Sequence, residues 1–171
     1  MLLLAIDPGS AESAYCLMDG YIPRQFGKVD NDVLLGMILG TCESGWGMIN
    51  AAALEMVASY GMPVGAEVFD TCVWIGRFAQ AIIQATGITP ERIYRIEEKL
   101  ALCHDSKAKD SNIRQALIDR FAIKDRKNGK GTKKDPDFFY GFSKDVWAAF
   151  ATACVYLDKR GEQYKCQGEK K

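Results

Sequence analysis

Three acidic residues stand where the sequence otherwise places apolar ones. Asp7 ends the apolar run 2–6, and Glu55 lies inside the run 51–57 (AAALEMV) between small apolar neighbours. Asp145 directly precedes the apolar positions of the last helical segment. Burying an unpaired carboxylate is costly, so each residue is expected to be protonated, paired with a cation or bound to a metal ion.

A hard divalent cation held by oxygen ligands is the simplest common explanation for these carboxylates. Asp7, Glu55 and Asp145, carried by two strands and one helix, could hold a pair of Mg²⁺ ions. One ion would activate water and the other would stabilise the leaving oxygen, which is the chemistry of phosphodiester hydrolysis. We therefore interpret the three as candidate catalytic metal ligands for one or two Mg²⁺ ions, with Mn²⁺ as a possible substitute.

Each carboxylate also has a simpler interpretation. Asp7 could form a turn with Pro8 and Gly9, Glu55 could face solvent from an edge strand, and Asp145 could complement a helix dipole. The metal interpretation rests on the three residues occurring together. His104, which lies beside an aspartate in a loop, is given no role.

The segments that must position these residues begin with three short apolar runs. The runs 2–7, 13–19 and 21–29 are separated by Pro8-Gly9 and Asp19-Gly20, which predicts an antiparallel meander. A helix capped by Asp30 or Asn31 follows and ends before the glycine-rich stretch near Ser44.

Helices and strands then alternate along the chain. The predicted elements are a buried strand over 51–57, an amphipathic helix over 68–87, a strand over 93–96, a helix over 113–121 and a last helix over 146–157 with Ser143 as its cap. This order indicates an α/β domain with a mixed sheet covered by helices. We expect one domain over 1–160 and a polar, frayed tail over 161–171.

Charge is balanced overall, with 22 Lys and Arg against 22 Asp and Glu, so its distribution matters more than its sum. The segment 124–134 (KDRKNGKGTKK) carries six basic residues and one acidic residue, which predicts a mobile basic loop. It is either a solvated surface or a site that contacts a DNA backbone. The candidate DNA-binding residues are Lys107, Lys124, Arg126, Lys127, Lys130, Lys133 and Lys134.

The cysteines and the N-terminal segment bear on whether the protein is expected to be intracellular. Six cysteines occur without a CxxC pair, as expected for reduced thiols in an intracellular protein. The apolar run 2–6 has no basic leader and stops at Asp7-Pro8-Gly9, so it is predicted to be neither a signal peptide nor a membrane span. A cytoplasmic protein without a membrane partner is expected.

Five motifs in order carry a resemblance to a known family. AIDPGS, ALEMV, EVFDTCVWIGRFAQA, KAKDSNIRQAL and KDVWAAFATA, spread over 2–157, are similar to the RuvC-type Holliday junction resolvases, especially their phage-borne members. The resemblance implies an RNase H-like fold, an endonuclease acting on branched DNA such as four-way junctions, and a homodimer that cuts two strands symmetrically in a bacterial host's cytoplasm. It places the family's metal-binding carboxylates at Asp7, Glu55 and Asp145. Its lysines near the scissile phosphate fall close to Lys99 and Lys109, with spacing that differs by about one residue.

One position departs from the pattern. Many bacterial members carry an aspartate three residues before the helical one, where this chain has Phe142. A second metal would then need another group or the substrate phosphate. Two alternatives stay open: a non-catalytic module that binds junctions, and an actin- or sugar-kinase-like ATP binder, because DPGS after a strand can cradle phosphate. The aromatic run 138–140 could stack on unpaired bases or anchor the loop.

Overall fold

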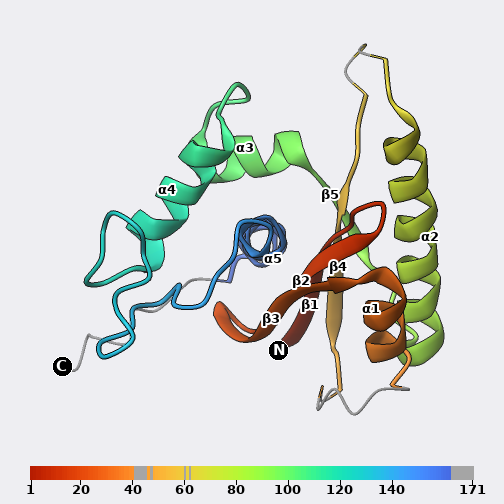
Figure 1. Ribbon diagram of the computed structural model, residues 1–171, viewed down its shortest axis with the longest axis horizontal. Helices are drawn as coiled ribbons and strands as arrows, with labels where there is room; N and C mark the ends of the chain where they lie inside the picture. The colour runs from red at the N-terminus through yellow and green to blue at the C-terminus, as the bar shows by residue number, and fades with distance from the viewer. Residues whose placement is uncertain (41–45, 47, 60, 62, 163–171) are drawn as a thin grey trace.

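The computed structural model describes residues 1–40, 46, 48–59, 61 and 63–162. These residues form a five-stranded sheet in the order β3-β2-β1-β4-β5 (Figure 1). The strands are β1 (Leu2–Asp7), β2 (Glu12–Asp19), β3 (Ile22–Asp30), β4 (Ala51–Met56) and β5 (Glu91–Tyr94). Strands β1 to β3 are antiparallel neighbours, whereas β4 runs parallel to both β1 and β5. The predicted meander and mixed sheet are confirmed.

Helices cover both faces of the sheet (Figure 1). The helices are α1 (Asn31–Ile38), α2 (Ala66–Thr86), α3 (Arg95–Cys103), α4 (Asp110–Phe121) and α5 (Val146–Lys159). Helices α1 and α2 pack on one face, and α5 packs on the other against β1, β2 and β4. Helices α3 and α4 pack on α5 rather than on the middle of the sheet. The predicted α/β architecture is therefore correct.

The alternation of side chains along β1 and β4 decides which residues face α5. Leu3 and Ala5 belong to the core beneath α5, as does Ala53 on β4, while the residues between them belong to the core beneath α1 and α2. Successive strand residues point to opposite faces, so the next residue in each series is Asp7 on β1 and Glu55 on β4. Both carboxylates therefore extend from the face that α5 covers.

Helix α3 was not predicted from the sequence. The strand expected over 93–96 ends at Tyr94, and Arg95 and Ile96 already belong to the helix. The backbone N–H of Tyr94 donates to Oε2 of Glu97 at a distance of 2.7 Å, and this hydrogen bond stabilises the first turn of the helix. Ile96, Leu100 and Cys103 recur at helical spacing along α3, although the one fully buried side chain of the described helix is the charged Glu98. This short pattern was missed because the predicted strand was extended across the start of the helix.

Helix α5 begins differently from the prediction. Asp145 itself is the N-cap residue, so the assignment of Ser143 as the cap was wrong. The Asp145 side chain makes no capping hydrogen bond, because its carboxylate pairs with Lys28 on β3 instead. The Asp145 carboxylate thus contacts a side chain of the sheet and not the backbone of its own helix.

The basic loop over 124–134 has a defined structure, because two carboxylates accept hydrogen bonds from its backbone and from the adjacent residues. Asp125 and Asp137 each accept several backbone N–H groups, and these hydrogen bonds lower the pKa of Asp137 to about 2 against the opposing effect of burial. The donors to Asp125 are Lys127, Asn128, Lys130 and Gly131, and those to Asp137 are Ile123, Lys124, Asp125 and Phe138. The prediction of a mobile segment missed this order because hydrophobic periodicity does not reveal hydrogen bonds that backbone N–H groups donate to carboxylates.

The aromatic residues after the loop anchor it to the core. Phe139 is fully buried, and Phe138 stacks on Phe121 with ring centroids 5.0 Å apart. Tyr140 is exposed. Stacking of Phe139 on DNA bases is therefore excluded in this arrangement, and both Phe138 and Phe139 anchor the loop to the core.

Several other sequence predictions concern the periphery of the fold. Cys16 and Cys154 are buried free thiols, whereas Cys72 is exposed; Cys42, Cys166, Ser44 and the tail over 163–171 lie outside the described residues. Glu162, at the start of the predicted tail, is bound to the core, since its carbonyl accepts the Tyr21 hydroxyl at 2.8 Å. Among the described helices, none has the length and apolar character needed to span a membrane.

Candidate active site

Asp7 and Glu55 lie side by side at the carboxyl ends of two parallel strands. Ile6 on β1 is in register with Leu54 on β4, so the next residue of each strand is a carboxylate on the same face. Strand β4 lies between β1 and β5, and the Glu55 side chain is only 15% exposed. The alternative that Glu55 faces solvent from an edge strand is therefore wrong.

This pair of carboxylates resists ionisation. Burial, together with the nearby charges of Glu55 and Glu98, raises the pKa of Asp7 to about 8. Burial also raises the pKa of Glu55, although the positive charge of Arg95 opposes that rise. Oε2 of Glu55 is buried and has no hydrogen-bond partner among the described residues. A buried carboxylate oxygen without a partner requires a proton or a cation close to it.

Asp145 lines the same cavity as this pair but is held by a different cation. Nζ of Lys28 lies 2.9 Å from Oδ2 of Asp145 and 3.4 Å from Oε2 of Glu12. The side chains of Lys28 and Asp145 are 38% and 40% exposed, and exposed ion pairs of this kind contribute at most about 1 kcal/mol. A divalent cation could therefore draw Asp145 away from Lys28 at small cost.

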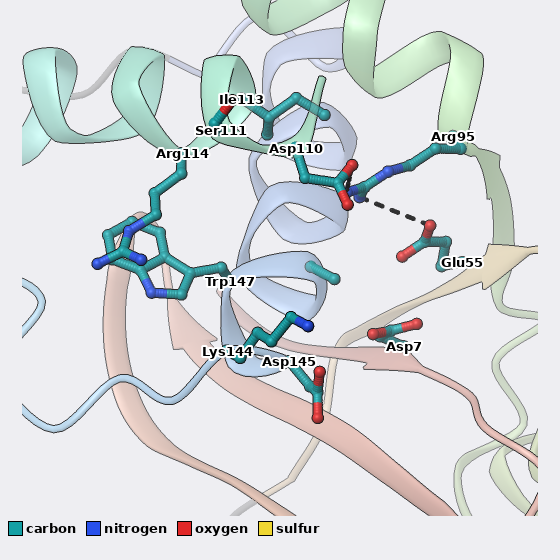
Figure 2. Close-up of a pocket in the computed structure, with 11 residues that line it drawn as sticks. Asp7, Glu55, Arg95, Asp110, Ser111, Ile113, Arg114, Lys144, Asp145 and Trp147 are labelled. Atoms are coloured by element: carbon teal, nitrogen blue, oxygen red, sulfur yellow. Dashed lines mark hydrogen bonds and ion pairs between the residues drawn. The ribbon is translucent and has the colours of Figure 1, made fainter. Parts of the chain in front are cut away.

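The three carboxylates line one open cavity of about 490 Å³, together with cationic side chains (Figure 2). Its lining residues are Asp7, Glu55, Arg95, Asp110, Ser111, Ile113, Arg114, Lys144, Asp145, Trp147 and Ala148. In Figure 2, Asp7 and Glu55 lie at one end of the view and Arg114 with Trp147 at the other. The cavity thus combines an acidic end, suited to a cation, with basic walls, suited to an anion that would approach that cation.

Neither lysine predicted to assist at a phosphate lines this cavity. Lys99 lines a smaller neighbouring cavity of about 200 Å³ with Arg95 and Ser106, and Lys109 is the N-cap residue of α4. The cations that do line it are Arg95, Arg114 and Lys144, which the sequence analysis did not propose. Lys144 could have been found, because it is adjacent in sequence to Asp145.

Two further acidic residues near the site were also missed. Asp110 lines the cavity and accepts from Nη2 of Arg95 at 2.7 Å, a hydrogen bond that lowers the pKa of Asp110. Glu98 is fully buried, and burial raises its pKa to about 8. No sequence pattern singled out either residue, because both belong to helix starts where acidic side chains are common.

Phe142, at the position where many relatives of the resembled family carry an aspartate, belongs to the core. Its side chain is buried, and its ring centroid lies 4.5 Å from that of Phe26 and 5.5 Å from that of Phe150. It is not among the residues that line the cavity. No carboxylate therefore enters the site from this position.

The described residues fit one hard divalent ion better than two. Asp7 and Glu55 offer adjacent carboxylates with a free buried oxygen, and oxygen donors are the ligands that Mg²⁺ and Mn²⁺ take. Over the described part of the chain, however, no three His, Cys, Asp or Glu side chains are grouped tightly enough to form a complete metal site. Asp145 could be a third protein ligand, although Lys28 already pairs with its Oδ2.

None of the candidate DNA-binding residues lines the cavity. Lys127, Lys133 and Lys134 are exposed on the basic loop, and Lys107 is exposed between α3 and α4. Lys124 pairs with Asp135, Arg126 donates to the carbonyl of Asp119, and Lys130 is half-buried. The loop follows the carboxyl end of α4, whereas Ser111 and Arg114 near the other end of that helix line the cavity.

The chain is similar in structure to Thermus thermophilus RuvC. No protein-family model and no curated protein sequence matches it. A structure of T. thermophilus RuvC matches with a TM-score of 0.65 and 16% identity over 94% of this chain and 96% of that one. T. thermophilus RuvC in complex with a Holliday junction substrate matches with a TM-score of 0.66 and 14% identity over the same shares.

A ROK hexokinase from T. thermophilus gives a TM-score of only 0.39, with 17% identity over 61% of this chain and 39% of that one, and it carries no argument about this chain. The two RuvC matches cover almost the whole chain, and their mixed sheet with helices on both sides is the one found here. The chain therefore has the RuvC form of the RNase H-like fold, as the sequence analysis predicted. At this level of identity the likeness establishes the fold alone.

Proposed function

We propose that this protein is a metal-dependent, structure-selective endonuclease that hydrolyses phosphodiester bonds in branched DNA such as four-way junctions. The observation that carries the proposal is the adjacent pair of Asp7 and Glu55, with its unpartnered oxygen, in an open cavity that also has basic walls. A neighbour in structure was solved in complex with a Holliday junction, which supports the choice of substrate.

Asp7, Glu55 and Asp145 are proposed as the protein ligands of the ion. A Mg²⁺ or Mn²⁺ ion bound there would lower the pKa of a bound water and polarise the scissile phosphate. Because the acidic end of the cavity repels phosphate, Lys144 and Arg114 on its walls would attract and orient the DNA backbone. Lys99 and Lys109 remain proposed as further cations at the phosphate.

The basic loop is proposed as the main contact with the DNA backbone outside the cavity. Backbone contacts from its cations and from Lys107 would give affinity that depends on salt and not on sequence, as recognition of a branched shape requires. The hydrogen bonds of Asp125 and Asp137 already order the loop. Little conformational entropy would then be lost when the loop binds DNA.

A homodimer is proposed through the outer face of α2. Phe69 and Val73, which are 61% and 62% exposed, lie one helical turn apart, with Cys72 exposed beside them. Large exposed apolar side chains grouped in this way are characteristic of interaction surfaces. A two-fold axis across this face would present two cavities to one junction, so that two strands could be cut symmetrically.

The direct test uses a synthetic four-way junction, labelled on each strand in turn, beside a linear duplex of the same sequence. The protein is incubated with each DNA in Mg²⁺, in Mn²⁺ and in EDTA. We expect cuts near the branch point in both metals, none in EDTA and none in the linear duplex. Tight junction binding without turnover in either metal would select the non-catalytic binding module, which the buried Phe142 would then explain.

A further inference from the structure

Arg95 connects three carboxylates that come from three different elements. Its Nη1 lies 3.6 Å from Oε1 of Glu55 on β4 and also pairs with Glu98 on its own helix, α3. Its Nη2 lies 2.7 Å from Oδ1 of Asp110 on α4. Figure 2 shows Arg95 reaching toward Glu55 with Asp110 beside it. A guanidinium can serve three acceptors at once because its donors form a rigid planar fork.

Glu98 fixes Arg95 in this place. The Glu98 side chain is fully buried, and its Oε1 accepts from the Thr152 hydroxyl on α5 at 2.7 Å, which leaves Oε2 for Arg95. Removing the partner of a buried charge is strongly destabilising, because the remaining charge has no compensation. Arg95 is therefore a permanent positive charge next to the acidic end of the cavity.

The two carboxylate oxygens of Glu55 have different surroundings. Oε1 is the oxygen nearest to Arg95, and Oε2 is the buried oxygen without a hydrogen-bond partner among the described residues. One oxygen is thus already neutralised by the protein, and one remains for a bound cation. Glu98 and Asp110, the other acidic groups on this side, are also already paired with Arg95.

We propose that Arg95 is a positioning residue whose fixed positive charge takes the place of a second divalent ion beside Glu55, so that the cavity binds a single metal ion per chain. The inference rests on the proposed function, since it assumes that Asp7 and Glu55 bind a metal. It explains how the chain can have Phe142 in the core and no carboxylate in its place, because the acidic groups that would attract a second ion are already paired with Arg95.

The test is the number of Mn²⁺ ions bound per chain, measured by equilibrium dialysis and by the electron paramagnetic resonance signal of free Mn²⁺. We expect one ion for the wild type and one for Arg95→Lys, which keeps the charge. Arg95→Ala releases Glu55, Glu98 and Asp110, so two ions are expected. Arg114→Ala is the matched control: it removes a cation from the same cavity that stacks on Trp147, and one ion is expected.

Thermal unfolding provides a second readout. Without metal, Arg95→Ala is expected to melt on the order of 10 °C below the wild type, and Mn²⁺ is expected to recover more of this loss than it adds to the wild type. If Arg95→Ala does not fold, the double variant Arg95→Ala/Glu98→Gln removes the buried charge together with its partner. Glu55 and Asp110 are still released in it, so a second, weaker Mn²⁺ is expected.

The outcomes separate this inference from the proposed function. Two ions on the wild type would overturn the role of Arg95 while leaving the metal-dependent nuclease intact. One ion on both the wild type and the folded Arg95 variants would show that Arg95 is only structural, and would also overturn the inference. No ion on the wild type would overturn both proposals.

Discussion

Nζ of Lys28 on β3 lies 2.9 Å from Oδ2 of Asp145, so an ion pair joins an outer strand of the sheet to the start of α5. The hydrogen bond to Asp145 raises the pKa of Lys28, so the lysine stays charged. Lys28 thus competes with any metal ion for the third carboxylate of the site. Because the pair is exposed, this competition is weak.

Replacing Lys28 by methionine should therefore tighten metal binding. The variant removes an interaction of at most about 1 kcal/mol, so we expect Mn²⁺ affinity to rise by up to about fivefold. Lys28→Arg, which keeps the charge, is the matched control and should leave the affinity close to that of the wild type. Calorimetric titration with Mn²⁺ measures both. Unchanged or weaker binding by Lys28→Met would remove Asp145 from the proposed ligand set.

The stability of the metal-free protein should decrease between about pH 5 and pH 8. Burial raises the pKa of Asp7 to about 8 in the folded state and also raises the pKa of Glu55, whereas in the unfolded chain both carboxyls ionise near pH 4. A folded-state pKa above the unfolded one contributes stability that is fully present below about pH 4 and lost as the pH rises through about 8. Mg²⁺ should reverse the loss, because a bound cation favours the ionised carboxylates.

Melting temperatures in EDTA across this pH range test the effect. Asp7→Asn removes one of the titrating groups, so it should flatten the decrease and raise the melting temperature at pH 8 by roughly 5 °C. Asp145→Asn, at an exposed carboxylate, should keep most of the decrease. A melting temperature that stays level or rises from pH 5 to pH 8 in the wild type would contradict the buried, mutually repelling carboxylates described here.

Removing cations from the basic loop should weaken junction binding in a salt-dependent way. Each lost phosphate contact lowers the slope of log affinity against log salt by about 0.9. The triple variant Lys127→Ala/Lys133→Ala/Lys134→Ala should therefore lower the slope by roughly 2 to 3. Arg24→Ala is the control, because Arg24 pairs with Asp19 at the opposite end of the sheet from Asp7. If the slope of log affinity against log salt is the same for the wild type and the triple variant, the loop does not contact DNA and is only a solvated surface.

Phe69→Glu should dissociate the proposed dimer. A charge at an exposed apolar position of α2 would be buried without a partner in a two-fold interface, which is unfavourable. Ile123→Glu is the matched control, because Ile123 is exposed to a similar extent but lies outside α2. Sedimentation velocity should show a dimer for the wild type and for the control, and a monomer for Phe69→Glu. A monomeric wild type at micromolar concentration would defeat the proposal.

The sequence was sufficient to group Asp7 with Glu55 because each carboxylate stands in or directly after a run of apolar residues, where a charge is costly. The structure adds that the two runs are parallel neighbours, which places their carboxyl ends together. The fold class followed from the order of apolar runs and turn residues and from helical periodicity. These are local signals, repeated over several residues, and they remain visible without any knowledge of tertiary contacts.

Arg95 and Lys28, which pair with carboxylates of the site, could not be predicted in this way, because their roles depend on contacts between distant segments. Glu98 becomes a buried anchor only through Thr152, which lies 54 residues further along the chain. Asp145 pairs with Lys28 only because β3 and the start of α5 meet. Helix α3, which carries Arg95, buries a glutamate and leaves Ile96 and Leu100 exposed, so its sequence does not resemble that of a helix packed on the core.

The most direct measurement of the central claim is single-turnover cleavage of a labelled four-way junction in Mg²⁺ by the wild type, Asp7→Asn and Glu55→Gln, beside junction binding in EDTA. If the two carboxylates hold the catalytic metal, each variant should bind the junction as well as the wild type does and cleave it at least about a hundredfold more slowly, a loss of about 3 kcal/mol. Cleavage at the wild-type rate by both variants would contradict the account.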